Sequence, residues 1–355
     1  MSCEIDLVPG GRRIGGDDPC FIIADIGQNH QGDVEIAKRM IAAIKESGAD
    51  CAKMQKCDIE SKFTKAALER PYATANSWGP TYGEHKRHLE FSRNQWRELK
   101  RYAEDEVGIL FAGAAADETS VDFLLDDLEL PFLCVPSLDS KNLPLLKRAA
   151  SKGRPLIVAT GTLNMSSVQT LYNVVKPLND NLILTQSTST FPLSPDDVHL
   201  RVIPTFRDKF PDVVVGYSGQ EAGLSISLAA VALGAKVLER HVTLDRSWKG
   251  SDHRGAVTMS ELRQLVTEVR TIERALGSSK KEMRPSEEAI CKKLGKSVVA
   301  AGDIPAGAEL ALDMLTIKVA QPIGFSPDQI YELVGKRTKA FIERDTTVME
   351  DAISV

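Results

Sequence analysis

The sequence has no paired-cysteine motif and no long apolar run. Its six cysteines are scattered over 355 residues without a CxxC pair. No stretch approaches the roughly 18 uninterrupted apolar residues of a membrane-spanning helix. The amino-terminal segment also has no apolar signal-peptide core. We therefore expect a cytoplasmic protein with reduced thiols, no disulfides and no membrane partner.

Basic charge is not in excess either. The chain has 44 Lys and Arg against 49 Asp and Glu, a net charge of −5, which argues against a nucleic-acid partner. Any phosphorylated ligand must therefore be bound by local donors. No internal repeat is visible, and the segment GQNHQG (27–32) lacks the GxGxxG spacing of a dinucleotide-binding turn.

What the sequence does contain is a regular alternation of apolar runs and amphipathic segments. The strand-like runs are residues 20–27, 51–55, 109–115, 132–137, 155–160, 182–189, 213–219 and 236–243. Apolar strands separated by helices indicate a parallel sheet, and eight such units predict an α/β fold of the closed (β/α)₈ TIM-barrel type. The opening segment, residues 4–16, predicts a hairpin that covers the bottom of this barrel.

A change of composition after Gly277 indicates a second domain. We expect the barrel and its hairpin to occupy residues 1–280, a polar linker to occupy 281–290, and a small, mostly β domain to occupy 291–355.

Polar residues at the carboxyl ends of barrel strands are the candidates for chemistry. Glu239 and His241 are two apart on the eighth strand and share a face, so they could supply two metal ligands or form a buried hydrogen bond. Lys53 could bind phosphate, form a Schiff base or pair with a carboxylate such as Asp25. The polar segments 81–91 and 248–255, taken alone, predict solvated surface loops.

Several segments, in order and over nearly the whole chain, resemble the sialic acid synthases. They include FIIADIGQNHQGD, GADCAKMQK, VVVGYSGQEAG, VLERHVTLDRSWKGSDH and LGKSVVAAGDIPAGAEL. The resemblance implies a barrel followed by an antifreeze-like domain, in a domain-swapped homodimer. It also implies the condensation of phosphoenolpyruvate with N-acetylmannosamine 6-phosphate to N-acetylneuraminate 9-phosphate, with Mn²⁺ or Mg²⁺ polarising the sugar aldehyde.

The resemblance also assigns roles to residues. Asp25 and Lys53 are the expected catalytic residues, and Glu239 and His241 the expected metal ligands, with Gln220 as a weak third ligand. The expected substrate-binding residues are Gln55, Ser137, Asp139, Ser189, Ser218 and Asp252.

Other positions depart from the family pattern. Cys134 stands in place of a lysine, Gln220 in place of a histidine, and Asp25 in place of a glutamate. Further departures are Pro136 and Leu138 for two glycines, an alanine for the third-strand hydroxyl within FAGAAAD, Ala159 for a serine, and Phe191 for a tyrosine. Together they remove positive charge and donors from a pocket for two anionic substrates.

Two hypotheses follow from these departures. The chain is either an active synthase with an altered pocket, or a paralogue with impaired catalysis that acts by binding or as a partner subunit. Residues 291–355 also resemble type III antifreeze proteins. However, Asp303, Glu309 and Asp313 charge the stretch that an ice-binding face would need to keep uncharged.

Overall fold

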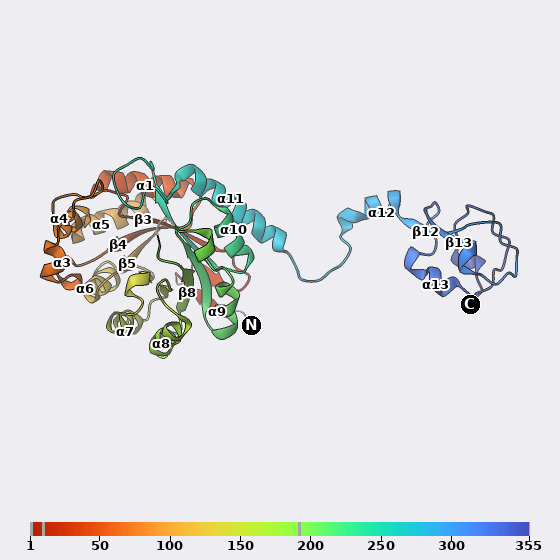
Figure 1. Ribbon diagram of the computed structural model, residues 1–355, viewed down its shortest axis with the longest axis horizontal. Coiled ribbons are helices and arrows are strands. Elements are labelled where there is room, and N and C mark those ends of the chain that lie inside the picture. The colour runs from red at the N-terminus through yellow and green to blue at the C-terminus, as the bar shows by residue number, and fades with distance from the viewer. Residues whose placement is uncertain (1–2, 9–10, 191–192, 355) are drawn as a thin grey trace. The chain divides into compact units, whose positions relative to one another are not determined.

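The computed structural model describes residues 3–8, 11–190 and 193–354. The chain divides into two compact units, Met1–Gly277 and Ser278–Val355, which are considered separately (Figure 1). Phe191, which the sequence singled out, lies outside the described residues.

The first unit is a closed barrel of eight parallel strands. They are β3 (Phe21–Gly27), β4 (Cys51–Lys56), β5 (Leu110–Ala115), β6 (Leu133–Val135), β7 (Leu156–Ala159), β8 (Leu182–Ser187), β9 (Val214–Gly219) and β10 (Val237–Thr243). Each strand pairs with its neighbour in sequence, and β10 pairs with both β9 and β3, which closes the ring. A short strand, β11 (Val257–Thr258), adds to β10. The predicted (β/α)₈ barrel is confirmed.

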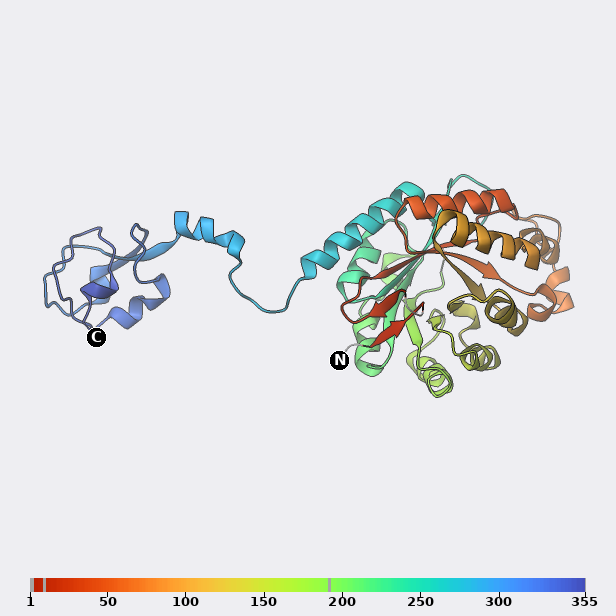
Figure 2. The ribbon, with the colours of Figure 1, turned by 180° about the vertical axis from the view of Figure 1, so that it is seen from behind.

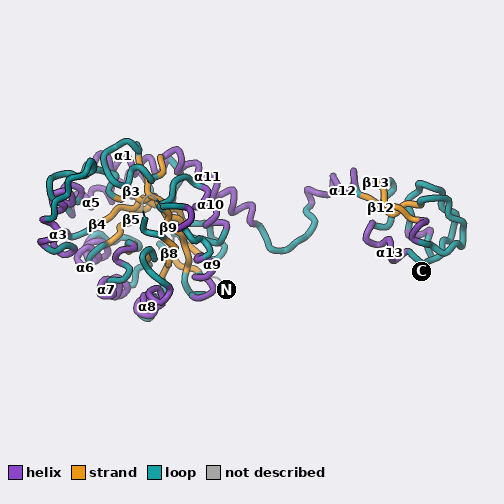
Figure 3. The backbone as a smooth tube through the Cα atoms, in the orientation of Figure 1, coloured by secondary structure: helices purple, strands orange, loops and turns teal. Residues whose placement is uncertain are grey.

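Helices surround the strands (Figure 3). They are α1 (Val34–Glu46), α5 (Arg93–Arg101), α6 (Glu118–Asp122), α7 (Leu143–Ser151), α8 (Met165–Val175), α9 (Val202–Lys209), α10 (Ser225–Ala232) and α11 (Met259–Leu276), with α5 and α6 continued by π-helical turns over Tyr102–Val107 and Phe123–Asp127. The connection from β4 to α5 is longer and carries three short helices, α2 (Ile59–Lys62), α3 (Lys65–Glu69) and α4 (Tyr82–Leu89).

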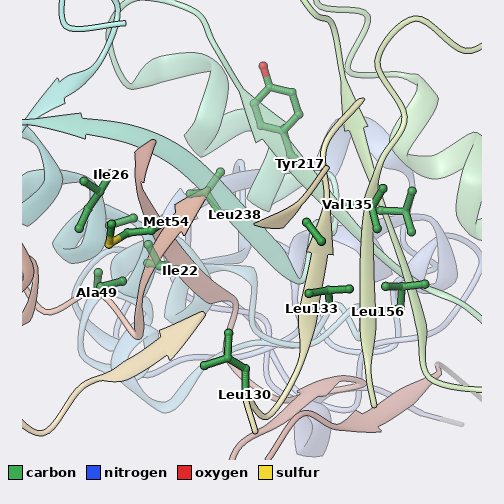
Figure 4. Close-up of a cluster of buried hydrophobic side chains, with 14 of the residues drawn as sticks. Ile22, Ile26, Ala49, Met54, Leu130, Leu133, Val135, Leu156, Tyr217 and Leu238 are labelled. Atoms are coloured by element: carbon green, nitrogen blue, oxygen red, sulfur yellow. The ribbon is translucent and has the colours of Figure 1, made fainter. Parts of the chain in front are cut away.

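The period of two along each strand sends alternate side chains to two different cores. Residues such as Ile22, Met54 and Leu238 face the helices and join the larger apolar cluster (Figure 4). Residues such as Phe21 and Cys134 belong to a second cluster that fills the barrel interior.

A hairpin closes the amino-terminal end of the barrel. Strands β1 (Glu4–Asp6) and β2 (Arg13–Gly15) pair antiparallel, and they are the two red strands in Figure 2. Ile5, Leu7 and Ile14 are at most 2% exposed and join the interior cluster. The hairpin expected from the sequence is therefore present, and its apolar face seals the barrel floor.

The second unit is small and has short strands. Strand β12 (Lys296–Ala300) pairs antiparallel with β13 (Leu315–Val319), and the helices are α12 (Glu288–Leu294) and α13 (Ile330–Leu333). Its own apolar core includes Val298, Ile304, Leu333 and Val348. Part of the expected linker is helical, because α12 begins at Glu288.

Candidate active site

A cavity of about 430 Å³ lies at the carboxyl ends of the barrel strands. It is lined by ten of the eleven site residues that the sequence singled out: Asp25, Lys53, Gln55, Ser137, Asp139, Ser189, Ser218, Gln220, Glu239 and His241. Asp252 is not among the lining residues, and its carboxylate accepts a hydrogen bond from the Ser251 hydroxyl (2.6 Å). Residues at the strand ends therefore do line one cavity. Asp252, which lies in a loop, does not line it.

The centre of the cavity is a lysine held between two carboxylates. Lys53 Nζ lies 2.8 Å from Glu239 Oε2 and 3.1 Å from Asp25 Oδ2. Parallel register brings these strands together, since Asp25 on β3 pairs with Lys53 on β4 and with His241 on β10. Lys53 is 4% exposed and Asp25 is 1% exposed. Of the three roles that the sequence left open for Lys53, the structure shows pairing with Asp25, and adds Glu239.

Both members of the Asp25–Lys53 pair are charged at neutral pH. Burial by itself raises the pKa of Asp25, but Lys53 and His241 outweigh it and hold this pKa below its ordinary value. Burial likewise lowers the pKa of Lys53, but Asp25 and Glu239 outweigh it and hold that pKa well above its ordinary value. The site is therefore a fixed ionic cluster inside the barrel.

Neighbouring polar groups complete the cluster. Ser218 Oγ donates to Glu239 Oε1 (2.9 Å), and Gln55 Nε2 donates to Asp25 Oδ2 (3.4 Å). Ser187 Oγ is buried and has no hydrogen-bond partner within the described part of the chain, whereas His241 Nδ1 lies 3.4 Å from Asp25 Oδ2. Since buried polar atoms are rarely left unpaired, Ser187 Oγ is available to a ligand.

The expected metal ligands are not preformed for a divalent cation, because Lys53 occupies Glu239. Over residues 3–8, 11–190 and 193–354, no three His, Cys, Asp or Glu side chains are grouped so that they could hold a metal ion. Glu239 is already engaged by the Lys53 ammonium and by Ser218. The third expected ligand, Gln220, offers a neutral amide oxygen rather than an imidazole. A cation in this place has to displace Lys53 from Glu239.

Cys134 lies on the apolar side of the site. It is 3% exposed and packs in the barrel interior with Cys51 and Phe132. Burial raises the pKa of its thiol well above the ordinary value, so it stays protonated and supplies no charge to a ligand. Lys53 is thus left to provide the cation at this depth of the cavity.

The β4–α5 connection forms a wall that the sequence interpretation missed. Tyr82 and Lys86, both on α4, line the cavity, and so do Lys62, Phe63 and Glu90. The expectation that segment 81–91 is a solvated loop was therefore wrong. The spacing of Tyr82, Lys86 and Glu90 at i, i+4 and i+8 is the signal that could have revealed a helical face turned to the site.

The loop after β10 was also misjudged in part. His253 is 1% exposed, and its Nδ1 lies 2.8 Å from Thr243 Oγ1. This histidine ties the loop 248–255 to the end of β10, so the prediction of a solvated loop is wrong for His253.

Comparison with known proteins identifies the family. The model of the NeuB family matches residues 40–281, about two thirds of the chain. The chain belongs to the NeuB family. A SAF-domain model matches residues 295–354, within the second unit. The resemblance to sialic acid synthases is thereby confirmed.

Individual NeuB relatives cover almost the whole chain. N-acetylneuraminate-9-phosphate synthase from Homo sapiens is 55% identical over 353 residues, which are 99% of this chain and 98% of the human protein. The protein of the same name from Drosophila melanogaster is 39% identical over 95% of this chain and 96% of its own length. Among solved structures, N-acetylneuraminic acid (sialic acid) synthetase from Leptospira borgpetersenii, in complex with citrate, is 31% identical with a TM-score of 0.72 and covers 82% of this chain and 96% of that chain.

Proposed function

We propose that this NeuB-family protein is an N-acylneuraminate 9-phosphate synthase. It condenses phosphoenolpyruvate with N-acetylmannosamine 6-phosphate and water to give N-acetylneuraminate 9-phosphate and phosphate. The observation that carries the proposal is the cavity, which brings Lys53 together with nine other residues that the sequence singled out. The 55% identity to the human synthase over nearly the full length supports it.

The residues of the cavity can perform the binding steps of this reaction. We propose that Lys53 contacts phosphoenolpyruvate, that Ser137 donates to its carboxylate or phosphate, and that Ser218 does so when its hydroxyl turns away from Glu239. Ser137 Oγ already accepts from Gly161 N (3.1 Å), which leaves its hydroxyl hydrogen for a ligand. The unpartnered Ser187 Oγ lies beside them and can donate as well.

The sugar side is proposed to involve Gln55, Asp139 and Ser189, which line the cavity, and Asp252, which lies in the loop after β10. The new carbon–carbon bond forms between the enol carbon of phosphoenolpyruvate and the sugar aldehyde carbon, and water adds at the carbon from which phosphate leaves. Asp25 is the proposed carboxylate for the water and proton steps. Its lowered pKa keeps it ionised, so it can accept a hydrogen bond from the water and orient it.

A direct assay tests the proposal. Purified protein is incubated with phosphoenolpyruvate, N-acetylmannosamine 6-phosphate and Mn²⁺, and phosphate release and the nine-carbon product are measured together. Turnover in the range of about 1–1000 s⁻¹ supports an active synthase. Absence of product with retained substrate binding instead supports the second hypothesis, an impaired paralogue that acts as a binding or partner subunit.

The concentration of divalent cation that the protein requires is expected to depend on the residue at position 220. Glu239, His241 and the weak donor Gln220 would hold the proposed cation, Mn²⁺ or Mg²⁺, which would have to displace Lys53 from Glu239. We expect Gln220→His to lower the half-saturating Mn²⁺ concentration by about 10- to 100-fold, because imidazole is the stronger ligand. Mn²⁺ binding followed by electron paramagnetic resonance measures this without turnover. Gln186→His, a buried change outside the cavity, is the control, and an equal response of both variants contradicts the assignment.

The proposal extends to assembly and location. We propose a domain-swapped homodimer, in which the SAF unit of one subunit covers the barrel of its partner. Tyr331 (74% exposed) and Phe341 (59% exposed) on the second unit support this, because they are large apolar side chains left in solvent. Light scattering that gives a monomer mass contradicts it.

We also propose a cytoplasmic location, which is supported by the free state of all six cysteines. No helix in the described ranges is long and apolar enough to cross a bilayer.

A further inference from the structure

Four lysines line the cavity, and their ionic partners differ. They are Lys53, Lys56, Lys62 and Lys86. Lys53 is held by Asp25 and Glu239, as described above. Lys56 Nζ lies 2.5 Å from Glu90 Oε1 and also donates to the Cys57 carbonyl. These two ammonium groups are neutralised by the protein itself.

Lys86 is different. Its Nζ donates to the neutral Gln28 Oε1 (3.0 Å) and lies 5.5 Å from the centre of the Tyr82 ring. Within the described part of the chain no carboxylate oxygen lies within 4 Å of it. Burial lowers the pKa of Lys86, and Asp252, a carboxylate that favours its charged form, does not outweigh this effect. A ligand anion would supply a closer partner.

Lys62 adds a second cation on the same wall. It ends α2, and its Nζ is 3.5 Å from Asp139 Oδ2, an atom that forms no hydrogen bond within the described residues. The Lys62 side chain is 29% exposed, so it stands nearer to solvent than the ionic cluster around Lys53. The positive charge of Lys62 also contributes to lowering the pKa of Lys86, for which burial is the largest cause.

The two ends of the cavity therefore suit different groups. Around Lys53 the strands present the hydroxyls of Ser137, Ser187 and Ser218, which fit one anionic reactant. The α2 and α4 wall presents two ammonium groups and a phenol, Gln28 after β3 adds an amide, and no carboxylate of the described residues lies within 4 Å of Lys86. A phosphate dianion matches this set, because ammonium groups bind phosphate as point charges that adapt to its position.

We propose that Lys86 and Lys62 bind the 6-phosphate of the acylated amino sugar and so make this protein select the phosphorylated sugar over the free one. The inference rests on the proposed function for the identity of the sugar. It assigns a specificity role to the β4–α5 connection, whereas the strand ends hold the reacting groups.

The test compares two sugars that differ only in the phosphate. Lys86→Met and Lys62→Met keep the length of each side chain and remove its charge. Each is expected to lower kcat/KM for N-acetylmannosamine 6-phosphate by about 10- to 100-fold, the size of one charge-assisted hydrogen bond. For unphosphorylated N-acetylmannosamine the change is expected to stay below about 3-fold. Lys86→Arg keeps the charge and is expected to retain most of the preference.

Lys65→Met is the matched control. Lys65 lies on α3 in the same connection, but its side chain is 88% exposed and it does not line the cavity. Its removal is expected to leave the ratio of the two kcat/KM values unchanged. Equal loss on both sugars in the Lys86 and Lys62 variants, or no loss on either, overturns the inference.

A binding measurement separates this inference from the proposed synthase activity. Calorimetry without phosphoenolpyruvate compares N-acetylmannosamine 6-phosphate with N-acetylmannosamine on the wild-type protein and on Lys86→Met. Tighter binding of the phosphorylated sugar that is lost in Lys86→Met supports the inference even if no product forms. Equal wild-type affinity for the two sugars overturns it even if the synthase reaction is observed.

Discussion

Replacing Lys53 with methionine is expected to lower the free energy of unfolding of the barrel by about 3–5 kcal/mol at pH 7. The substitution leaves Asp25 and Glu239 facing each other without the ammonium group that now lies within 3.1 Å of both. Uncompensated buried charge is among the costliest defects in a protein interior. Loss of product formation is expected as well, because Lys53 is the cation nearest the proposed phosphoenolpyruvate site.

The Lys53 effect is expected to depend on pH. Asp25 has a lowered pKa in the folded protein, so it adds stability above its ordinary pKa of 3.8, and that stability is lost as the pH falls through the lowered value. Lys53→Met removes the cause of the lowering. Its deficit relative to the wild type should therefore be largest at neutral pH and shrink in acid below about pH 4.

Denaturant unfolding followed by tryptophan fluorescence measures this change in the barrel alone. All three tryptophans, Trp78, Trp96 and Trp248, lie in the first unit. Lys65→Met, which removes an exposed charge, is expected to cost less than about 0.5 kcal/mol. Adding Glu239→Gln to Lys53→Met should recover part of the loss. A deficit that stays constant between pH 7 and pH 3.5 shows that the carboxylates are not its cause.

Replacing Arg240 with methionine is expected to destabilise the barrel by a similar amount, about 3–5 kcal/mol. Arg240 is 1% exposed and alternates with Glu239 and His241, so it projects into the helical layer. Its Nη1 lies 3.0 Å from Glu221 Oε1 and donates to Ser227 Oγ (2.8 Å). Without the guanidinium, Glu221 becomes a buried carboxylate supported only by hydroxyl donors.

The Arg240 prediction has a surface counterpart in the same part of the barrel. Arg246 pairs with Glu261, but these side chains are 40% and 30% exposed, so Arg246→Met is expected to cost less than about 1 kcal/mol. The double variant Arg240→Met with Glu221→Gln should be more stable than Arg240→Met alone. Denaturant unfolding followed by tryptophan fluorescence measures the stability of each variant. Equal losses for the Arg240 and Arg246 substitutions would contradict the prediction that burial of the ion pair determines the loss.

Much of the fold follows from period and composition. The apolar runs predict the barrel strands to within one or two residues at most ends, because parallel strands buried on both faces must be apolar. The predicted end of α1 is also confirmed, because Gly48 adopts φ +85° there and ends the helix. The carboxyl-end rule then places Lys53, Glu239 and Ser218 in one cavity, because it depends only on chain direction.

Sequence period could not predict which polar groups pair. Lys53 was expected near Asp25 on the adjacent strand, but its contact with Glu239 comes from β10, two strands away, and depends on barrel closure. Lys86 was missed because the β4–α5 connection has no long apolar period, and its short helix forms in contact with the barrel. His253 was missed because one histidine in a polar loop has no pattern to indicate burial.

The hairpin at the amino-terminal end determines where substrates can enter the barrel and where products can leave it. Among the described residues, Leu7 and Ile14 seal that end, and the catalytic cavity lies at the opposite end, where the strands finish. Both reactants must enter by the route along which sugar product and inorganic phosphate leave. Each turnover therefore has to empty the chamber before the next can begin, which makes departure of the products a natural point of control.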